Sequence, residues 1–158
     1  MRKIFFILFC IPFLTLAQID KTIKLKVTVM QNFVHKDSLG ETAFWQTKGK
    51  ITFGIVNYTA EQNPIFKQLF INQYQELLKI YKVMVVSEDE KDTALYVKTL
   101  IRQEDDYRNL LTKEQLKAYS NKLSELKSKN LELYDSYCSL FFPDELLAEY
   151  KLKFSYIK

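Results

Sequence analysis

The sequence is poor in the residues that usually form loops and small-molecule sites. Its 158 residues include only 3 Gly, 3 Pro and 1 His. So little glycine argues against a loop-rich β-sandwich and against a glycine-rich loop that holds a phosphate. No Walker motif, dinucleotide fingerprint or Gly-x-Ser-x-Gly occurs, and a zinc or nucleophile–histidine site would have only His35 to use. We therefore assign no catalytic, cofactor-binding or metal-binding residue from the sequence.

Long hydrophobic runs are also missing, with one exception at the start of the chain. The apolar run from Ile4 to Leu16 follows two basic residues. It is shorter than the ~20 residues that a membrane-spanning helix needs. Small residues lie one and three positions before Gln18, as in a secretory signal peptide. We predict cleavage after Ala17 and export of residues 18–158 to the periplasm or the exterior, as a protein not integral to a membrane.

Cysteine is equally scarce. Of the 2 cysteines, Cys10 lies in the predicted leader, so Cys138 remains alone and no internal disulfide is expected. Free cysteine is among the most buried residue types, so Cys138 is predicted to be a small buried hydrophobe in a helix. A reactive thiol or an intermolecular bridge is the alternative.

Charge of one sign is not in excess. The chain has 23 basic and 19 acidic residues; without Arg2 and Lys3 the balance is 21 to 19, about +2. A nucleic-acid-binding domain needs a strongly basic face, so this class is disfavoured. Hydrophobic residues make up 47% of the chain and aromatic residues 15%, which is typical of a globular protein. Residues 18–158 have the length of a single domain.

Three segments show the alternation of a half-buried strand. In 22–34, Ile23, Leu25, Val27 and Val29 alternate with Lys24, Lys26 and Thr28. A similar pattern covers 49–58, and a third covers the C-terminal "YKLKFSYIK". A helical continuation is the alternative for the third segment, since neither Gly nor Pro interrupts it. These patterns predict a small antiparallel sheet of two N-terminal strands and one C-terminal strand.

The middle of the chain predicts three longer helices. The first begins at Asn63-Pro64 and runs to about Val85. The second begins at Ser87, which forms a capping box with Glu90, and the third begins at Thr112. Together with the sheet they predict an α+β fold in which a small antiparallel sheet packs with a three-helix bundle.

The third helix carries a seam at steps of three and four residues. Its members are Leu116, Tyr119, Leu123, Leu126, Asn130, Leu133, Tyr137 and Leu140. We expect this seam to pack against the other helices of the chain, as in a helical bundle. Packing against a second chain is the alternative, with Asn130 fixing the register.

The stretch "LLTKEQLKAY" at 110–119 opens this helix. Thr112 is expected to cap the helix and Gln115 to reach back to it. From Leu111 to Gln115 the stretch resembles the Leu-Thr-x-x-Gln proteins of the bacterial envelope, and the leader resembles those of Bacteroidetes envelope proteins. The resemblance implies an exported, helical, cofactor-free protein related to a stress-induced, ATP-independent chaperone. The chain has one copy of the motif, where that family usually has two.

Two acidic groups are the remaining candidates for chemistry. They are Glu88-Asp89-Glu90-Asp92 and Glu104-Asp105-Asp106. Neither has the alternating ligands and glycine of a calcium loop, so the first is interpreted as a helix-start charge run and the second as a solvated helix face. A carboxylate-based hydrolase would need two carboxylates about 5–10 Å apart in a cleft, with Glu104 or Asp106 buried in a pocket.

The sequence therefore predicts an exported, non-catalytic protein-binding domain whose partner is unidentified. A periplasmic chaperone-like protein and a carboxylate-based hydrolase are the alternatives. A structural envelope component that oligomerises through the seam is a third.

Overall fold

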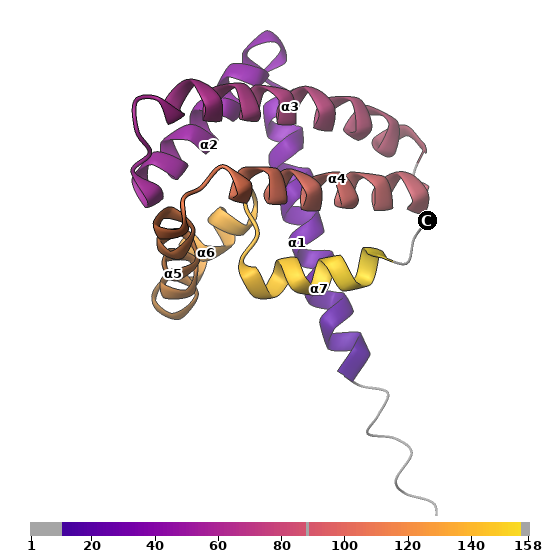
Figure 1. The fold of residues 1–158 in the computed structure, drawn as a ribbon. Helices are drawn as coiled ribbons and strands as arrows, with labels where there is room; N and C mark the ends of the chain where they lie inside the picture. The colour runs from indigo at the N-terminus through magenta and orange to yellow at the C-terminus, as the bar shows by residue number, and fades with distance from the viewer. Residues whose placement is uncertain (1–10, 88, 156–158) are drawn as a thin grey trace, which may run out of the picture.

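The structure is a computed structural model, and it describes residues 11–87 and 89–155 (Figure 1). Within these ranges the chain forms helices and no strand. The predicted α+β fold class is therefore wrong, and the fold is an all-helical bundle. In the same ranges, no helix combines the length and the hydropathy that crossing a membrane requires.

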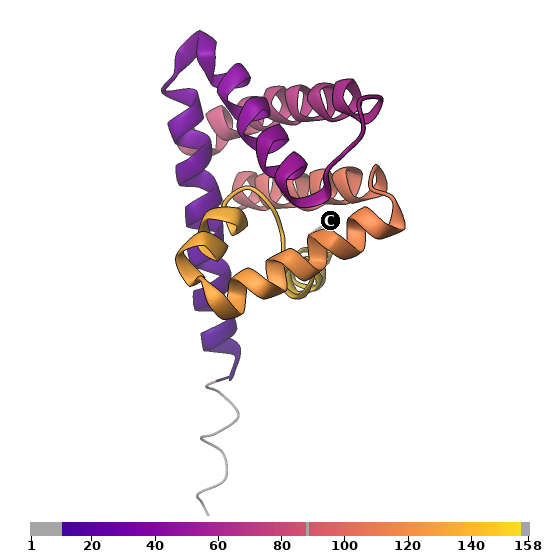
Figure 2. The same ribbon diagram turned by 90° about the vertical axis from the view of Figure 1, so that its left-hand side faces the viewer.

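The helices follow one another with short connections. They are α1 (Ile11–Val34), the 3₁₀ turn η1 (Asp37–Leu39), α2 (Gly40–Val56), α3 (Gln62–Ser87), α4 (Glu90–Asn109), α5 (Lys113–Lys129), α6 (Leu131–Cys138) and α7 (Asp144–Ser155). Helices α3, α4 and α7 lie one below the other in Figure 1, and α1 crosses behind them. Figure 2 shows α1 along one side of the bundle. Helix α6 lies beside α1, and α5 runs from α6 toward the opposite side of the bundle.

Helix α1 replaces the first predicted strand. Its buried residues are spaced by three and four: Thr22, Lys26, Met30 and Phe33. The alternating aliphatic residues flank this line on both sides and are only partly buried. A helix that buries a wide stripe shows a period of two over a short window, and this misled the strand prediction.

Helix α2 replaces the second predicted strand for the same reason. Its buried residues recur at every fourth position: Gly40, Phe44, Lys48, Thr52 and Val56. The helix ends at Asn57, which has the left-handed conformation (φ 48°, ψ 56°) and donates its backbone N–H to the Phe53 carbonyl.

Helix α7 replaces the third predicted strand, so the helical alternative is confirmed for residues 144–155. It buries Leu146, Leu147, Tyr150 and Phe154 at helical spacing. This face packs against α4. The rest of the predicted strand, residues 156–158, lies outside the described residues.

The boundary between α3 and α4 differs in detail from the prediction. Ser87 is the last residue of α3, and the cap of α4 is Asp89, whose carboxylate accepts from the Lys91 backbone N–H at 2.8 Å. The predicted capping box of Ser87 with Glu90 is therefore wrong. The Ser87 hydroxyl instead donates to the Asp92 carboxylate.

The predicted seam is confirmed in α5 and ends at Asn130. Tyr119, Leu123 and Leu126 are buried in the bundle. Asn130 leaves the helical conformation (φ −152°, ψ 87°) and caps α6 by accepting from the Leu133 backbone N–H at 3.0 Å. Asparagine competes for backbone hydrogen bonds in this way, so one predicted helix becomes two.

The capping box at the start of α5 is confirmed. The Thr112 hydroxyl accepts from the Gln115 backbone N–H at 3.2 Å, and the Gln115 side chain accepts from the Thr112 backbone N–H at 3.0 Å. The Gln115 amide also donates to the Gln62 amide oxygen at 2.9 Å. The Leu-Thr-x-x-Gln motif therefore has a local structural role: it caps the start of α5 and links it by a hydrogen bond to the start of α3.

Replacing Thr112 with alanine should lower the free energy of unfolding by about 1 kcal/mol, because a backbone N–H of the first turn loses its acceptor. Urea unfolding followed by circular dichroism measures the change. Ser124→Ala, in the exposed middle of α5, is the control and should not lower stability, because alanine has a higher helix propensity than serine. Equal stability of the two variants would contradict a capping role for Thr112.

Candidate functional site

The structure does not bring His35 and Cys138 together. His35 is exposed in the turn after α1, and not at a strand end as predicted. Cys138 is buried at the end of α6, in a groove of about 320 Å³ that Leu25 of α1 also lines. Leu25 lies ten residues before His35, which is about 15 Å along a helix. A cysteine–histidine pair is therefore excluded by the fold.

Cys138 is the small buried hydrophobe that its sequence context predicts. Burial raises the pKa of its thiol above the ordinary value, against the opposing influence of the nearby Lys26 ammonium. A raised pKa keeps the thiol protonated and poorly nucleophilic at neutral pH.

The members of the second acidic group, Glu104-Asp105-Asp106, lie in different surroundings. Asp105 pairs with Lys151 at 2.7 Å and Asp106 with Arg102 at 2.9 Å, both on the surface as predicted. Glu104, by contrast, is only 4% exposed, so its assignment to a solvated face is wrong. No cluster of three or more potential metal ligands occurs within residues 11–87 and 89–155.

Glu104 lies at the centre of the bundle and its carboxylate is fully engaged. It accepts from the Arg108 guanidinium at 2.8 Å, from the Tyr119 hydroxyl at 2.7 Å and from the Phe142 backbone N–H at 3.2 Å. The Arg108 side chain also donates to the Phe142 carbonyl and to Asp144. These contacts join α4, α5 and the segment between α6 and α7.

Lys26 reaches the same centre from α1. Its side chain is 3% exposed and its ammonium donates to the Phe141 carbonyl at 2.9 Å. The ammonium also lies 3.8 Å from the centroid of the Phe142 ring. A ring face attracts a cation, and this attraction is stronger away from water.

Lys48 reaches the centre from α2 and is 6% exposed. Its ammonium donates to the Gln73 side-chain oxygen at 2.8 Å, and the Gln73 amide in turn donates to the Gln103 carbonyl at 2.9 Å. Three aromatic rings surround the ammonium at 5.0–5.5 Å from their centroids: Phe44, Phe70 and Phe141. Within the described part of the chain, no carboxylate lies within ion-pair distance of either Lys26 or Lys48.

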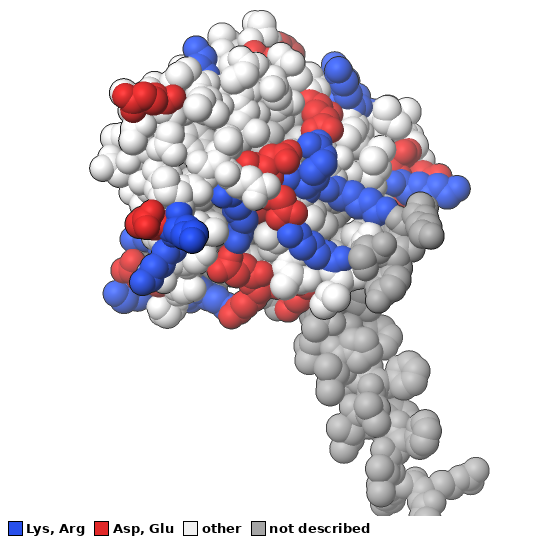
Figure 3. Space-filling view, viewed as in Figure 1, with Lys and Arg blue, Asp and Glu red and all other residues white. Residues whose placement is uncertain are grey.

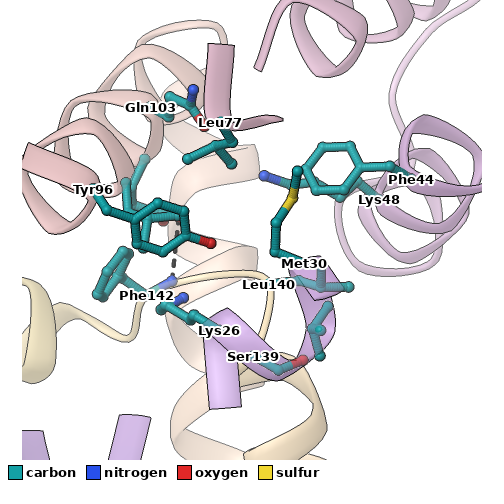
Figure 4. Close-up of a pocket in the computed structure, with 13 residues that line it drawn as sticks. Lys26, Met30, Phe44, Lys48, Leu77, Tyr96, Gln103, Ser139, Leu140 and Phe142 are labelled. Carbon is teal, nitrogen blue, oxygen red and sulfur yellow. Dashed lines mark hydrogen bonds between the residues drawn. The ribbon is translucent and has the colours of Figure 1, made fainter. Parts of the chain in front are cut away.

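Both lysines face one cavity of about 20 Å³ (Figure 4). Its wall also includes Glu104, and the Tyr96 hydroxyl points toward the space between the two ammonium groups. The remaining wall is largely apolar, with Met30, Phe44, Leu77 and Phe142 among its residues. We call this cavity and its two lysines the lysine centre.

Burial makes the charged form of each lysine costly. It lowers the pKa of Lys26 to about 7 and that of Lys48 to about 8, and the Glu104 carboxylate only partly opposes this. The protonation of both ammonium groups therefore changes near neutral pH, whereas an exposed lysine titrates near pH ~10.4.

The lysine centre is not among the features predicted from the sequence. The alternating pattern of 22–34 predicts Lys26 on the solvated face of a strand, and no sequence pattern predicts a role for Lys48. Both lysines stand in lines of buried residues at helical spacing, Lys26 four residues from Thr22 and Met30, and Lys48 four residues from Phe44 and Thr52. That spacing was the one sequence signal that would have indicated them.

Glu104 meets one condition of the hydrolase alternative, because it is buried beside a cavity. The other condition is not met among the described residues, since Glu104 is the one carboxylate that lines this cavity. A space of about 20 Å³ holds one water-sized molecule and no sugar or peptide. The lysine centre is therefore not a carboxylate-pair cleft.

A second candidate lies on the surface. The N-terminal half of α3 exposes a row of uncharged side chains, visible as white surface in Figure 3, and the exposed Lys67 and the Glu41 carboxylate bonded to Gln75 adjoin it. We call it the neutral face; its residues are Asn63, Pro64, Ile65, Gln68, Asn72 and Gln75. The surface formed by α4 and α7 is charged instead: its ion pairs appear in Figure 3 as alternating red and blue patches.

Comparison with known proteins gives no relative. No protein-family model, no curated protein and no solved structure matches the chain.

Proposed function

We propose that the protein is an exported, non-catalytic binding protein that takes a protein partner on the neutral face. The exposure of Ile65 within an uncharged row carries the proposal: this side chain is 51% exposed. The centres of protein–protein interfaces are depleted in charged residues and are built around apolar anchors. Amide side chains such as Gln68 and Asn72 add hydrogen bonds without favouring either sign of charge.

Export rests on the leader described above. Cleavage after Ala17 would fall within α1, which begins at Ile11. The buried face of α1 that the structure describes starts at Thr22 and would stay intact. Expressing the full chain with a C-terminal tag in a bacterial host and measuring the intact mass tests the cleavage. Recovery of residues 18–158 in the periplasm or medium supports export, and an uncleaved chain in the cytoplasm contradicts it.

The binding test compares two matched variants. Ile65→Asp and Leu131→Asp each place a carboxylate in the first turns of a helix, where it suits the helix dipole, so both should fold. Ile65 lies on the neutral face, whereas Leu131 is 63% exposed on α6. Tagged wild-type protein and both variants serve as baits in native envelope extract, and mass spectrometry identifies the captured proteins.

We expect one stoichiometric partner on the wild type and on Leu131→Asp, with capture by Ile65→Asp reduced about tenfold or more, equivalent to ~1.4 kcal/mol. A broad set of unfolded proteins would instead favour the chaperone-like alternative that the Leu-Thr-x-x-Gln resemblance suggests. Capture that is equal on all three baits, or absent from all three, would refute the neutral face as a binding surface.

A further inference from the structure

We propose that the lysine centre binds one monovalent anion the size of a halide, held between the ammonium groups of Lys26 and Lys48. This site is separate from the neutral face, and the proposal does not depend on a protein partner.

The first argument is charge. Lys26, Lys48 and Arg108 bring three cations to the middle of the bundle, and in the part of the chain that the structure describes they face one buried carboxylate, Glu104. Asp144, which pairs with Arg108, is 56% exposed and faces solvent. Glu104 offsets only part of this charge, so the centre carries an excess of positive charge whenever both lysines are protonated. Such an excess is strongly disfavoured for buried groups.

The second argument is hydrogen bonding. Each ammonium has three N–H donors, and in the described residues Lys26 uses one on the Phe141 carbonyl and Lys48 one on Gln73. The Glu104 carboxylate accepts from three other donors, which are the Arg108 guanidinium, the Tyr119 hydroxyl and the Phe142 backbone N–H. N–H groups of both lysines are therefore left for a guest in the cavity that both of them line.

The third argument is size and surroundings. A cavity of about 20 Å³ admits one water-sized guest. Its largely apolar wall strengthens the attraction between an anion and the two cations, because electrostatic forces are poorly screened there. Sulfate and phosphate are too large for this space. A water molecule would fit but would add no charge, so the proposal commits to the anion.

The fourth argument is a link to pH. The ionisable groups around the cavity are Lys26 of α1, Lys48 of α2, and Tyr96 and Glu104 of α4. Behind them lie Arg108, Tyr119 of α5 and Cys138 of α6. Helix α3 contributes the neutral Leu77 and Gln73, together with Tyr81 beside Tyr96 and Glu76, which accepts from Gln103. Of these, the two lysines change charge near neutral pH, so an anion should bind at pH 6 and leave at pH 10.

Bromide is a suitable probe because it is a monovalent halide that can be located by anomalous X-ray scattering. Thermal unfolding is measured at pH 6 while gluconate is replaced by bromide at constant ionic strength. We expect a saturating rise in Tm of about 4 °C at ten times the dissociation constant, and no rise at pH 10. Crystals grown with bromide at pH 6 should show one anomalous peak in contact with both Nζ atoms.

Variants on the same two helices supply the controls. Lys26→Met and Lys48→Met should each abolish the bromide response, whereas Lys24→Met and Lys50→Met remove exposed charges and should keep it. A response that is equal at both pH values, or retained in Lys26→Met, would overturn the proposal. So would a crystal with only water in the cavity. If the buried variants do not fold, the wild-type pH comparison and the anomalous map decide the matter by themselves.

Discussion

Replacing Glu104 with glutamine should lower the free energy of unfolding by about 3–5 kcal/mol at pH 7. The variant keeps the size of the side chain but removes Glu104, which among the described residues is the one buried carboxylate at the lysine centre. An amide also has one oxygen, and it cannot accept from Arg108, Tyr119 and the Phe142 backbone N–H as the carboxylate does. Cations and donors are then left buried without their partner.

Urea unfolding of the wild type and of Glu104→Gln measures this loss. The control is Glu125→Gln on α5, which removes a surface carboxylate paired with Lys122 and Lys129 and should change stability little. The cost of Glu104→Gln should shrink at pH 9.5, where the two buried lysines are largely neutral. A loss below about 1 kcal/mol at pH 7 would contradict the central role given to Glu104.

Raising the pH from 6.5 to 8.5 should increase the free energy of unfolding by about 2–3 kcal/mol. The folded-state pKa is about 7 for Lys26 and about 8 for Lys48, below the ~10.4 of an unfolded lysine. In this range unfolding takes up protons, because the unfolded lysines are charged and the folded ones are becoming neutral. Fewer protons therefore favour the folded state, and stability rises with pH.

This window avoids most of the opposing contribution from Cys138. Burial raises the pKa of that thiol, so an unfolded thiol ionises first and destabilises the fold only as pH rises above about 8.5. Lys26→Met should remove the larger share of the rise, and Lys24→Met should preserve it, because Lys24 is exposed. Stability that stays flat or falls between pH 6.5 and 8.5 would show that neither lysine is shifted as the structure indicates.

Features set by neighbouring residues could be predicted from the sequence. The capping box of Thr112 and Gln115 needs only a few residues, and the buried line of Tyr119, Leu123 and Leu126 follows from their spacing. The start of α3 also lies within one residue of the predicted cap, Asn63. Such features need no information about the rest of the chain.

The helical spacing of Lys26 and Lys48 is visible in the sequence, but neighbouring residues do not predict that the two ammonium groups are buried. Lys26 stands on a buried face because its ammonium has an acceptor in Phe141, and that acceptor is a backbone carbonyl with no trace in the sequence. A lysine in an amphipathic pattern normally indicates the solvated side. With Lys26 on the solvated side, the aliphatic residues beside it form an alternation that predicts a strand.

The span of the Lys26–Phe141 contact has a consequence for how the chain is assembled. The two residues are separated by 115 positions, and the surface pair of Lys21 with Asp135 by 114. Synthesis delivers the first helix long before either partner exists, while contacts between α3 and α4 join neighbouring parts of the chain and can form early. The contacts of α1 with the C-terminal half therefore need almost the whole chain, and we expect them to form after the pairing of α3 with α4.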